Sequence, residues 1–280
     1  MELRQYEGKA HAAGYLKYRV VPHEVISRII SSIEKKEPNS WELAVDVGCG
    51  SGQVTIPLAA YFATVVGTDN SSAQLEMALI NSNPPNVTYR QCSAEELPFA
   101  SGEVDLVMSM SAAQCFDRPK FLMEADRVLR PGGCLAAGCH TSDVELEYGD
   151  VSNTLNDICN EFYAALSPFR LTDDLSFAKL YFEMFDSCSY PDKEWTECFR
   201  VKRIMPLTGY IGMVKSYSSY QCLLQKDPAE AECLSTDIRN NLTCPQPQTP
   251  ASKTVRAVRG PGGDKTLCCA FKIKASCYLP

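Results

Sequence analysis

One short segment, residues 43–53, constrains the fold of this chain more than any other. An apolar run there leads to Asp46, after which Gly48, Gly50 and Gly52 occupy alternate positions and a helical pattern follows. Glycines in such a turn tolerate positive φ and let backbone N–H groups approach a ligand closely. The segment therefore predicts a parallel strand that enters a ligand-binding loop, with a plain structural turn as the alternative.

The spacing of these glycines excludes two common phosphate-binding loops. The dinucleotide fingerprint G-x-G-x-x-G places its third glycine one residue later than this loop does. A Walker loop needs a lysine before Ser or Thr, and this loop contains no lysine. The loop is therefore expected to bind a ligand of another kind.

A second apolar run, residues 65–69, ends in Asp69, which follows Asp46 by 23 residues. An acid at the tip of the next parallel strand can accept both ribose hydroxyls of an adenosine ligand, because a carboxylate has two acceptor oxygens. The alternative is a helix N-cap, because Ser71 and a helical run follow. Both roles are compatible if Asn70 or Ser71 provides the cap.

Apolar runs and helical patterns alternate through the first half of the chain. Strands are predicted at about 43–47, 64–68, 87–91, 104–110 and 134–139. Alternating β and α elements indicate an α/β fold with a doubly wound, mainly parallel, Rossmann-like sheet. Ligands bind such sheets at the carboxyl ends of the strands. Four predicted strand ends carry candidate ligand-binding residues: Asp46, Asp69, Ser93 and Met110.

Residues 41–139 resemble the methyltransferase domain shared by the quinone-biosynthesis and trans-aconitate methyltransferases, which belong to the class I S-adenosylmethionine-dependent methyltransferases. The resemblance rests on four features: Asp46 followed by G-x-G-x-G, the second acid Asp69, the strand and loop at 87–99, and the helix within 121–135 that ends at Pro-Gly-Gly. The opening segment 6–19, with its Tyr…Tyr-x-x-Tyr-Arg pattern, is similar to the trans-aconitate-like branch. S-adenosylmethionine is therefore the implied cofactor, and methyl transfer to a small molecule is the implied reaction.

The resemblance also assigns cofactor contacts to individual residues. The glycine loop would hold the methionine end of the cofactor, Asp69 the ribose, and the Ser93 segment the adenine. Relatives often carry Asp where Ser93 stands, so the neutral hydroxyl predicts weaker binding there. Tyr18 and Arg19 would fold over the cofactor as a lid, or pack as an ordinary amphipathic helix. The predicted cofactor-binding residues are Asp46, Gly48, Gly50, Gly52, Gln53, Asp69, Asn70, Ser93, Ala94, Glu95, Met110, Tyr18 and Arg19.

Gln114 and His140 are the predicted catalytic residues. Relatives in the trans-aconitate-like branch often have His-Trp where this chain has Gln114-Cys115, and glutamine can orient a substrate but cannot act as a base. A hydroxyl acceptor would need a base, for which His140 is the candidate. A carboxylate acceptor needs no base and would instead be bound by a cation. The candidate cations are Arg200, Lys202 and Arg203.

Two other functions are compatible with the sequence: methylation of a lipid or quinone-type ring, and cofactor binding by a catalytically degenerate relative. In each case four regions are expected. Residues 1–40 would form an N-terminal helical lead-in or lid, and 41–140 the cofactor-binding core. Residues 141–240 would form a helical cap at the substrate, and 241–280 an atypical tail that could leave the sheet edge incomplete.

Composition narrows the range of partners. A net charge of −7 disfavours a nucleic-acid substrate. No apolar run approaches the ~18 residues of a membrane span, and the N-terminus lacks a signal-peptide core, so a cytoplasmic protein is predicted. The 14 cysteines form no C-x-x-C pair and the 3 histidines complete no zinc spacing, so reduced thiols and no metal are expected.

Overall fold

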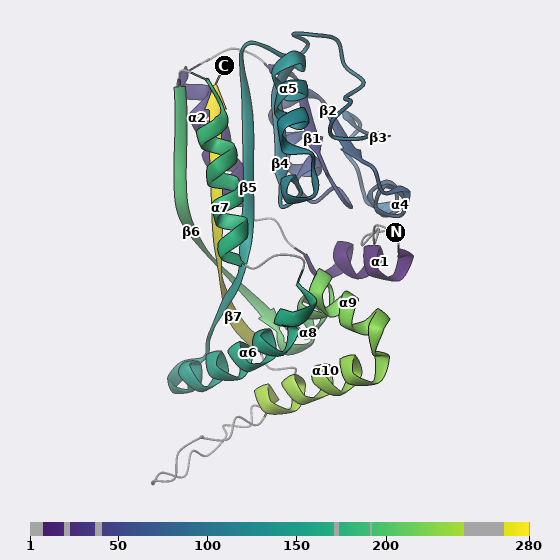
Figure 1. Ribbon diagram of the computed structural model, residues 1–280, viewed down its shortest axis with the longest axis vertical. Coiled ribbons are helices and arrows are strands. Elements are labelled where there is room, and N and C mark those ends of the chain that lie inside the picture. The colour runs from purple at the N-terminus through teal and green to yellow at the C-terminus, as the bar shows by residue number, and fades with distance from the viewer. Residues whose placement is uncertain are drawn as a thin grey trace. The chain divides into compact units, whose positions relative to one another are not determined.

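The computed structural model describes residues 8–19, 23–36, 41–170, 174–190, 192–243 and 266–279 (Figure 1). Its strands are β1 (Trp41–Val47), β2 (Phe62–Asp69), β3 (Val87–Gln91), β4 (Val104–Met110), β5 (Leu129–Glu147), β6 (Asp192–Pro206) and β7 (Thr266–Leu279). Its α-helices are α1 (Lys9–Tyr18), α2 (His23–Lys36), α3 (Thr55–Leu58), α4 (Ser72–Ile80), α5 (Arg118–Val128), α6 (Ser152–Leu166), α7 (Asp174–Ser187), α8 (Leu207–Lys215), α9 (Ser218–Lys226) and α10 (Pro228–Thr243). Short 3-10 helices are η1 (Ala113–Cys115), η2 (Gly149–Val151) and η3 (Ser167–Phe169).

The described strands form one seven-stranded sheet in the order β3-β2-β1-β4-β5-β7-β6. Strand β1 pairs in parallel with β2 and β4, β2 with β3, and β4 with β5. These are the five strands predicted from the sequence, and the mainly parallel Rossmann-like class is confirmed. The strand order reverses between β1 and β4, which is the point at which such sheets bind ligands.

The core lies around β4, which is covered on both faces. Every residue from Val104 to Ser109 is buried, as expected for a central parallel strand. Helix α5 adds Phe121, Ala125 and Val128, which recur at helical spacing and belong to the same hydrophobic cluster. Fully burying an aliphatic or aromatic side chain contributes about 1.5–3 kcal/mol, so this cluster holds α5 firmly on the sheet.

The helical cap predicted over 141–240 is wrong for residues 192–206, which form β6 at one end of the sheet order. No apolar run marks this segment, because charged residues interrupt it throughout. Charged side chains are typical of edge strands, since they discourage pairing with other chains. One of them, Glu194, lies 2.7 Å from Arg28 of α2 in an exposed ion pair.

The tail contributes to the sheet as well. Residues 266–279 form β7, which lies between β5 and β6 instead of leaving the incomplete edge considered for 241–280. This segment alternates small, apolar and lysine residues, a composition compatible with a strand. Residues 244–265, which belong to the predicted tail, lie outside the described residues.

The chain divides into two compact units. The first consists of Met1–Ser142, Asp174–Arg200 and Lys272–Pro280, and the second of Asp143–Asp173 and Val201–Phe271. All predicted cofactor-binding residues belong to the first unit. The second contains a buried polar cluster, in which the hydroxyl of Tyr210 lies 2.9 Å from that of Tyr163 and 3.0 Å from the Cys159 sulfur.

Two kinds of partner site are absent from the described residues. None of the helices there combines the length and the apolar character needed to cross a bilayer. Nor does that part of the chain bring three or more His, Cys, Asp or Glu side chains together in a way that could hold a metal ion.

Candidate functional site

The glycine loop between β1 and α3 has the backbone shape that its glycines permit. Gly48, Gly50 and Gly52 have φ values of +72°, +54° and +85°, which residues with side chains rarely adopt. The N–H groups of Gly48 and Cys49 both donate to the carbonyl oxygen of Thr68 on β2, at 2.8 and 2.9 Å. The loop therefore folds back over the end of β2.

Asp69, at that end of β2, links the loop to α4. Its Oδ2 accepts a hydrogen bond from the N–H of Gly50 and its Oδ1 one from the N–H of Ser71, both at 2.8 Å. Ser71 caps α4, because its hydroxyl accepts from the N–H of Gln74 at 3.3 Å. Each carboxylate oxygen has more than one lone pair, so these bonds are compatible with a ligand hydroxyl at the same group. The neighbouring Asn70 is exposed.

Asp46 is the second-last residue of β1 and is 1% exposed. Its Oδ2 accepts a hydrogen bond from the hydroxyl of Thr55, the first residue of α3, at 2.7 Å. Burial raises the pKa of Asp46 from its ordinary value near 3.8 to about 7. The hydrogen bond from Thr55 lowers this pKa, and the nearby charge of Asp69 raises it further. A cation bound close by would favour the ionised carboxylate.

This raised pKa predicts a pH-dependent stability. Because Asp46 binds its proton more tightly in the folded state than in the unfolded state, the free energy of unfolding should fall as pH rises from about 4 to about 7. A shift of this size corresponds to a loss on the order of 4 kcal/mol. The variant Asp46→Asn should lack this part of the slope. Urea unfolding at several pH values measures it, and parallel pH profiles for the two proteins would contradict the prediction.

Tyr89 of β3 is a site residue that the sequence did not reveal. A Cβ atom at Gly52 would lie 2.3 Å from the Tyr89 hydroxyl oxygen, and one at Gly67 would lie 2.6 Å from its ring. The ring therefore fills the space that these two glycines leave, and its hydroxyl donates to Oδ1 of Asn83 at 2.9 Å. Because the contact joins β3 to the glycine loop, no local pattern indicates it.

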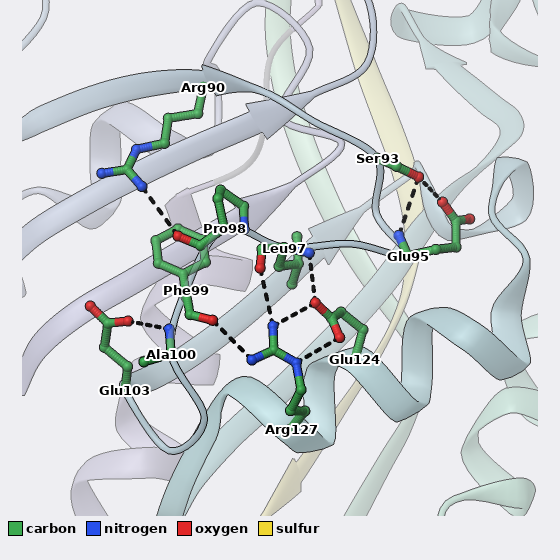
Figure 2. Close-up of polar contacts among 10 residues, drawn as sticks. All are labelled: Arg90, Ser93, Glu95, Leu97, Pro98, Phe99, Ala100, Glu103, Glu124 and Arg127. Carbon is green, nitrogen blue, oxygen red and sulfur yellow. Dashed lines mark hydrogen bonds and ion pairs between the residues drawn. The ribbon is translucent and has the colours of Figure 1, made fainter.

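Figure 2 shows the loop that follows β3 and its links to α5. The Ser93 hydroxyl donates to one carboxylate oxygen of Glu95. The other oxygen of Glu95 accepts from the N–H of Asp117, the N-cap of α5, at 2.7 Å. Ala94 between them is buried, whereas Ser93 is exposed. These contacts fix the loop, and adenine binding by Ser93, Ala94 and Glu95 stays a prediction.

Two charged residues of α5 hold the next part of this loop (Figure 2). Arg127 donates to the carbonyl oxygens of Leu97 and Phe99 at 3.1 and 2.9 Å. Glu124 accepts from the N–H of Leu97 at 2.7 Å and also pairs with Arg127 at 2.6 Å. The i,i+3 spacing of these opposite charges was the only sequence signal, and it did not indicate the loop as their partner.

The segment after β4 is constrained by an unusual backbone and a buried tyrosine. Met110 ends β4, and Ser111 has φ +57°, the one positive value among the described non-glycine residues. Such strain persists only where the surroundings impose it, and it clusters at functional sites. The side-chain amide of Gln114 donates to the Ser111 carbonyl oxygen at 2.7 Å and accepts from the Tyr181 hydroxyl at 2.8 Å. Tyr181, on α7, is a second residue that sequence reasoning missed.

The other candidates near the chemistry are less closely defined. His140 belongs to β5, and its side chain lies outside the described part of the structure, as does that of Arg200. In the second unit, Lys202 pairs with Glu147 at 2.7 Å and Arg203 donates to the Lys202 carbonyl oxygen at 2.9 Å. The catalytic and acceptor-binding roles of all four stay predictions.

The N-terminal helix is joined to the glycine loop. The side-chain amide of Gln53 donates to the carbonyl oxygen of Tyr15 at 3.3 Å, and α1 contacts α4, as Figure 1 also shows. The Arg19 guanidinium lies over the Tyr15 ring, 5.2 Å from its centre. Tyr18 is the last residue of α1. These contacts hold α1 beside the glycine loop, and the lid role of Tyr18 and Arg19 stays a prediction.

The matched family agrees with this geometry. Residues 45–137 match the family described as "Methyltransferase domain". This region is a class I methyltransferase domain. Both strand-end acids and the glycine loop lie within the matched residues, as does Gln114 in η1, after β4.

Individual relatives support the same assignment. The chain is 38% identical over 129 residues to trans-aconitate 2-methyltransferase of Deinococcus radiodurans, a match that covers 45% of this chain and 46% of that one. It is 41% identical over 112 residues to a provisionally assigned methyltransferase of Dictyostelium discoideum, covering 40% of each. The matches thus span less than half the length of these curated relatives. A solved structure provisionally assigned as a type II methyltransferase, from Anaeromyxobacter dehalogenans, shares the fold, with a TM-score of 0.68, 19% identity, and coverage of 93% of this chain and 97% of that one.

Proposed function

We propose that this protein transfers a methyl group from S-adenosylmethionine to a small-molecule acceptor. The observation that carries the proposal is the hydrogen bond from the Gly50 N–H to Asp69, which brings the glycine loop and the second strand-end acid into one site. This site lies where the strand order reverses between β1 and β4. The family match covers residues 45–137, and we propose the activity for the whole protein.

The described residues fit this cofactor. Among the described residues, a Cβ atom at Gly50 would make only ordinary van der Waals contacts, with the Gln74 side chain at 3.7 Å and the Tyr15 ring at 3.9 Å, so no side chain crowds the loop backbone there. Asp69 offers carboxylate oxygens to ribose hydroxyls at the tip of β2. Asp69 places a carboxylate where a cationic sulfonium compound is expected to bind, and a cation bound there would favour the ionised form of Asp46, whose pKa burial raises.

The bound cofactor supplies an electrophilic methyl group on a cationic sulfur, and the protein supplies alignment and exclusion of water. Gln114 is the side chain best placed to orient an acceptor, because Tyr181 and the Ser111 carbonyl hold its amide in one position. Burial raises the pKa of Tyr181 well above its usual value. Its hydroxyl therefore stays protonated at neutral pH and serves as a donor, not as a base.

A carboxylate is our first candidate for the acceptor. The groups described after β4, Gln114 and Tyr181, orient and donate but do not remove a proton, and a carboxylate needs no base. The Deinococcus relative named for trans-aconitate, a carboxylate, supports this choice. A hydroxyl or quinol acceptor would require a base, a role that His140 would then take.

Calorimetric titration with S-adenosylmethionine and S-adenosylhomocysteine tests the proposal. Wild-type protein should bind both, and Asp69→Ala should weaken binding by about 50-fold or more, because charge-assisted hydrogen bonds to the ribose are lost. Asp227→Ala is the matched control, since it removes a helix-capping carboxylate from the second unit, where the Glu230 N–H is its partner. Its affinity should equal that of the wild type.

Absence of binding by folded wild-type protein would refute the proposal. If both ligands bind, transfer of labelled methyl groups to a panel of carboxylic acids and quinols identifies the acceptor class. A base-labile methyl ester product, which releases methanol on saponification, would support the carboxylate. A methyl ether formed from a quinol would instead assign the chemistry to a ring hydroxyl.

A further inference from the structure

Gln74 carries the clearest unexplained feature of the first unit. It lies in the first turn of α4 and is 2% exposed, and its side-chain oxygen Oε1 is buried without a hydrogen-bond partner. Leaving a buried acceptor unsatisfied costs about 1–3 kcal/mol, and natural proteins rarely do so without a reason. A ligand that donates a hydrogen bond would remove this cost.

This oxygen lies beside the glycine loop. A Cβ added at Gly48 would lie 2.4 Å from the Cβ of Ala112, and one added at Gly52 would lie 2.3 Å from the Tyr89 hydroxyl oxygen. Close neighbours therefore fill the space beside both glycines. At Gly50 an added Cβ would instead make only ordinary contacts, and the nearest atom, at 3.7 Å, is Oε1 of Gln74. The unsatisfied acceptor therefore faces the one glycine of the loop that is not tightly covered.

The surrounding charge favours a cationic donor over a neutral one. Asp69 accepts from the Gly50 N–H itself, and Asp46 lies close enough to Asp69 for the two charges to interact. A neutral amide oxygen beside two carboxyl groups attracts a protonated amine and repels a carboxylate. Of the groups on the proposed cofactor, the amino group of its methionine end is both cationic and a hydrogen-bond donor.

We propose that the Oε1 atom of Gln74 accepts a hydrogen bond from the protonated α-amino group of S-adenosylmethionine, and so makes Gln74 a cofactor-binding residue that selects ligands with an amino-acid end. This inference rests on the proposed function. It concerns only the amino-acid end of the ligand, which allows it to be tested apart from the nucleoside end.

The test measures binding of three ligands to wild type, Gln74→Met and Gln74→Glu by calorimetry. S-adenosylhomocysteine has the amino and carboxyl groups, decarboxylated S-adenosylmethionine keeps only the amino group, and 5′-methylthioadenosine has neither. Gln74→Met should weaken the first two about tenfold or more, equivalent to 1.4 kcal/mol, and leave the third unchanged. Gln74→Glu should bind the first two at least as tightly as Gln74→Met does, because it retains an acceptor.

Each other outcome overturns the inference in a recognisable way. Equal weakening of all three ligands would give Gln74 a structural role, and no weakening of any would give it none in binding. Weakening of S-adenosylhomocysteine alone would mean that Gln74 holds the carboxylate. Failure of the wild type to bind any of the three would refute the proposed function instead. Urea unfolding without ligand is the fold control: Gln74→Met should be at least as stable as wild type, since it removes an unsatisfied polar atom.

Discussion

Replacing Gly48 with alanine is expected to lower the free energy of unfolding by about 3–4 kcal/mol, one of the two largest effects predicted for this protein. Gly48 has φ +72°, and a Cβ there would lie 2.4 Å from the Cβ of Ala112 and 3.0 Å from the Phe116 ring. The backbone strain accounts for about 1–2 kcal/mol, and the clash with the segment after β4 for the rest. Urea unfolding monitored by far-UV circular dichroism measures the total.

Gly102 provides a matched control. Its φ is +71°, nearly the same as at Gly48, but an added Cβ meets nothing within 4 Å. Gly102→Ala should therefore cost only the backbone part. Adding Ala112→Gly to Gly48→Ala should recover much of the steric part and little of the backbone part. Equal losses for Gly48→Ala and Gly102→Ala would show that the segment after β4 does not press on the loop.

The second large effect is expected at Asp105, on β4. Its Oδ2 accepts from the N–H groups of Glu42 and Leu43 at 3.0 and 2.8 Å, and its Oδ1 from the Nε of Arg130 at 2.5 Å. The side chain is largely buried. Asp105→Ala would leave two backbone donors and part of a guanidinium without this acceptor. We expect a loss of about 3–5 kcal/mol in the free energy of unfolding.

Glu103→Ala is the control for this experiment. Glu103 is also an acid beside β4 that accepts a backbone hydrogen bond, from Ala100 at 2.6 Å, but it is exposed. Water replaces an exposed acceptor, so this variant should lose less than about 1 kcal/mol. Similar losses for the two variants would contradict the argument that burial makes Asp105 important.

The centre of the parallel half of the sheet, β1 and β4, could be predicted because these strands are largely buried on both faces. Such strands appear in the sequence as short apolar runs, and glycine or an acid marks their ends. Strand β6 gave no such signal, because a charged edge strand looks like a solvent-exposed segment. Strand β7 is separated from both neighbours by long stretches of chain, so its pairing could not be read from any local pattern.

The residues of the candidate site likewise include some that the sequence predicts and some that it does not. Asp46, Asp69 and the glycine loop stand at strand ends, so topology alone predicts that they lie together. Tyr181 acts through a single contact across the fold, with Gln114, and the role proposed for Gln74 depends on its place beside Gly50; the residue type reveals neither. For Gln114, the sequence predicted its place after β4 but not the tyrosine that fixes its amide.

The place of β7 in the sheet affects how the protein folds during synthesis. Strands β5 and β6 both pair with a strand that is made after them, and residues 207–265 separate β6 from β7. At about 5–20 residues per second, a ribosome takes about 3–12 s to translate that interval. During this time two strand edges in the nascent chain lack their shared partner, and exposed edges invite pairing with other chains. Charged residues along an edge strand discourage such pairing, and β6 carries them along its length.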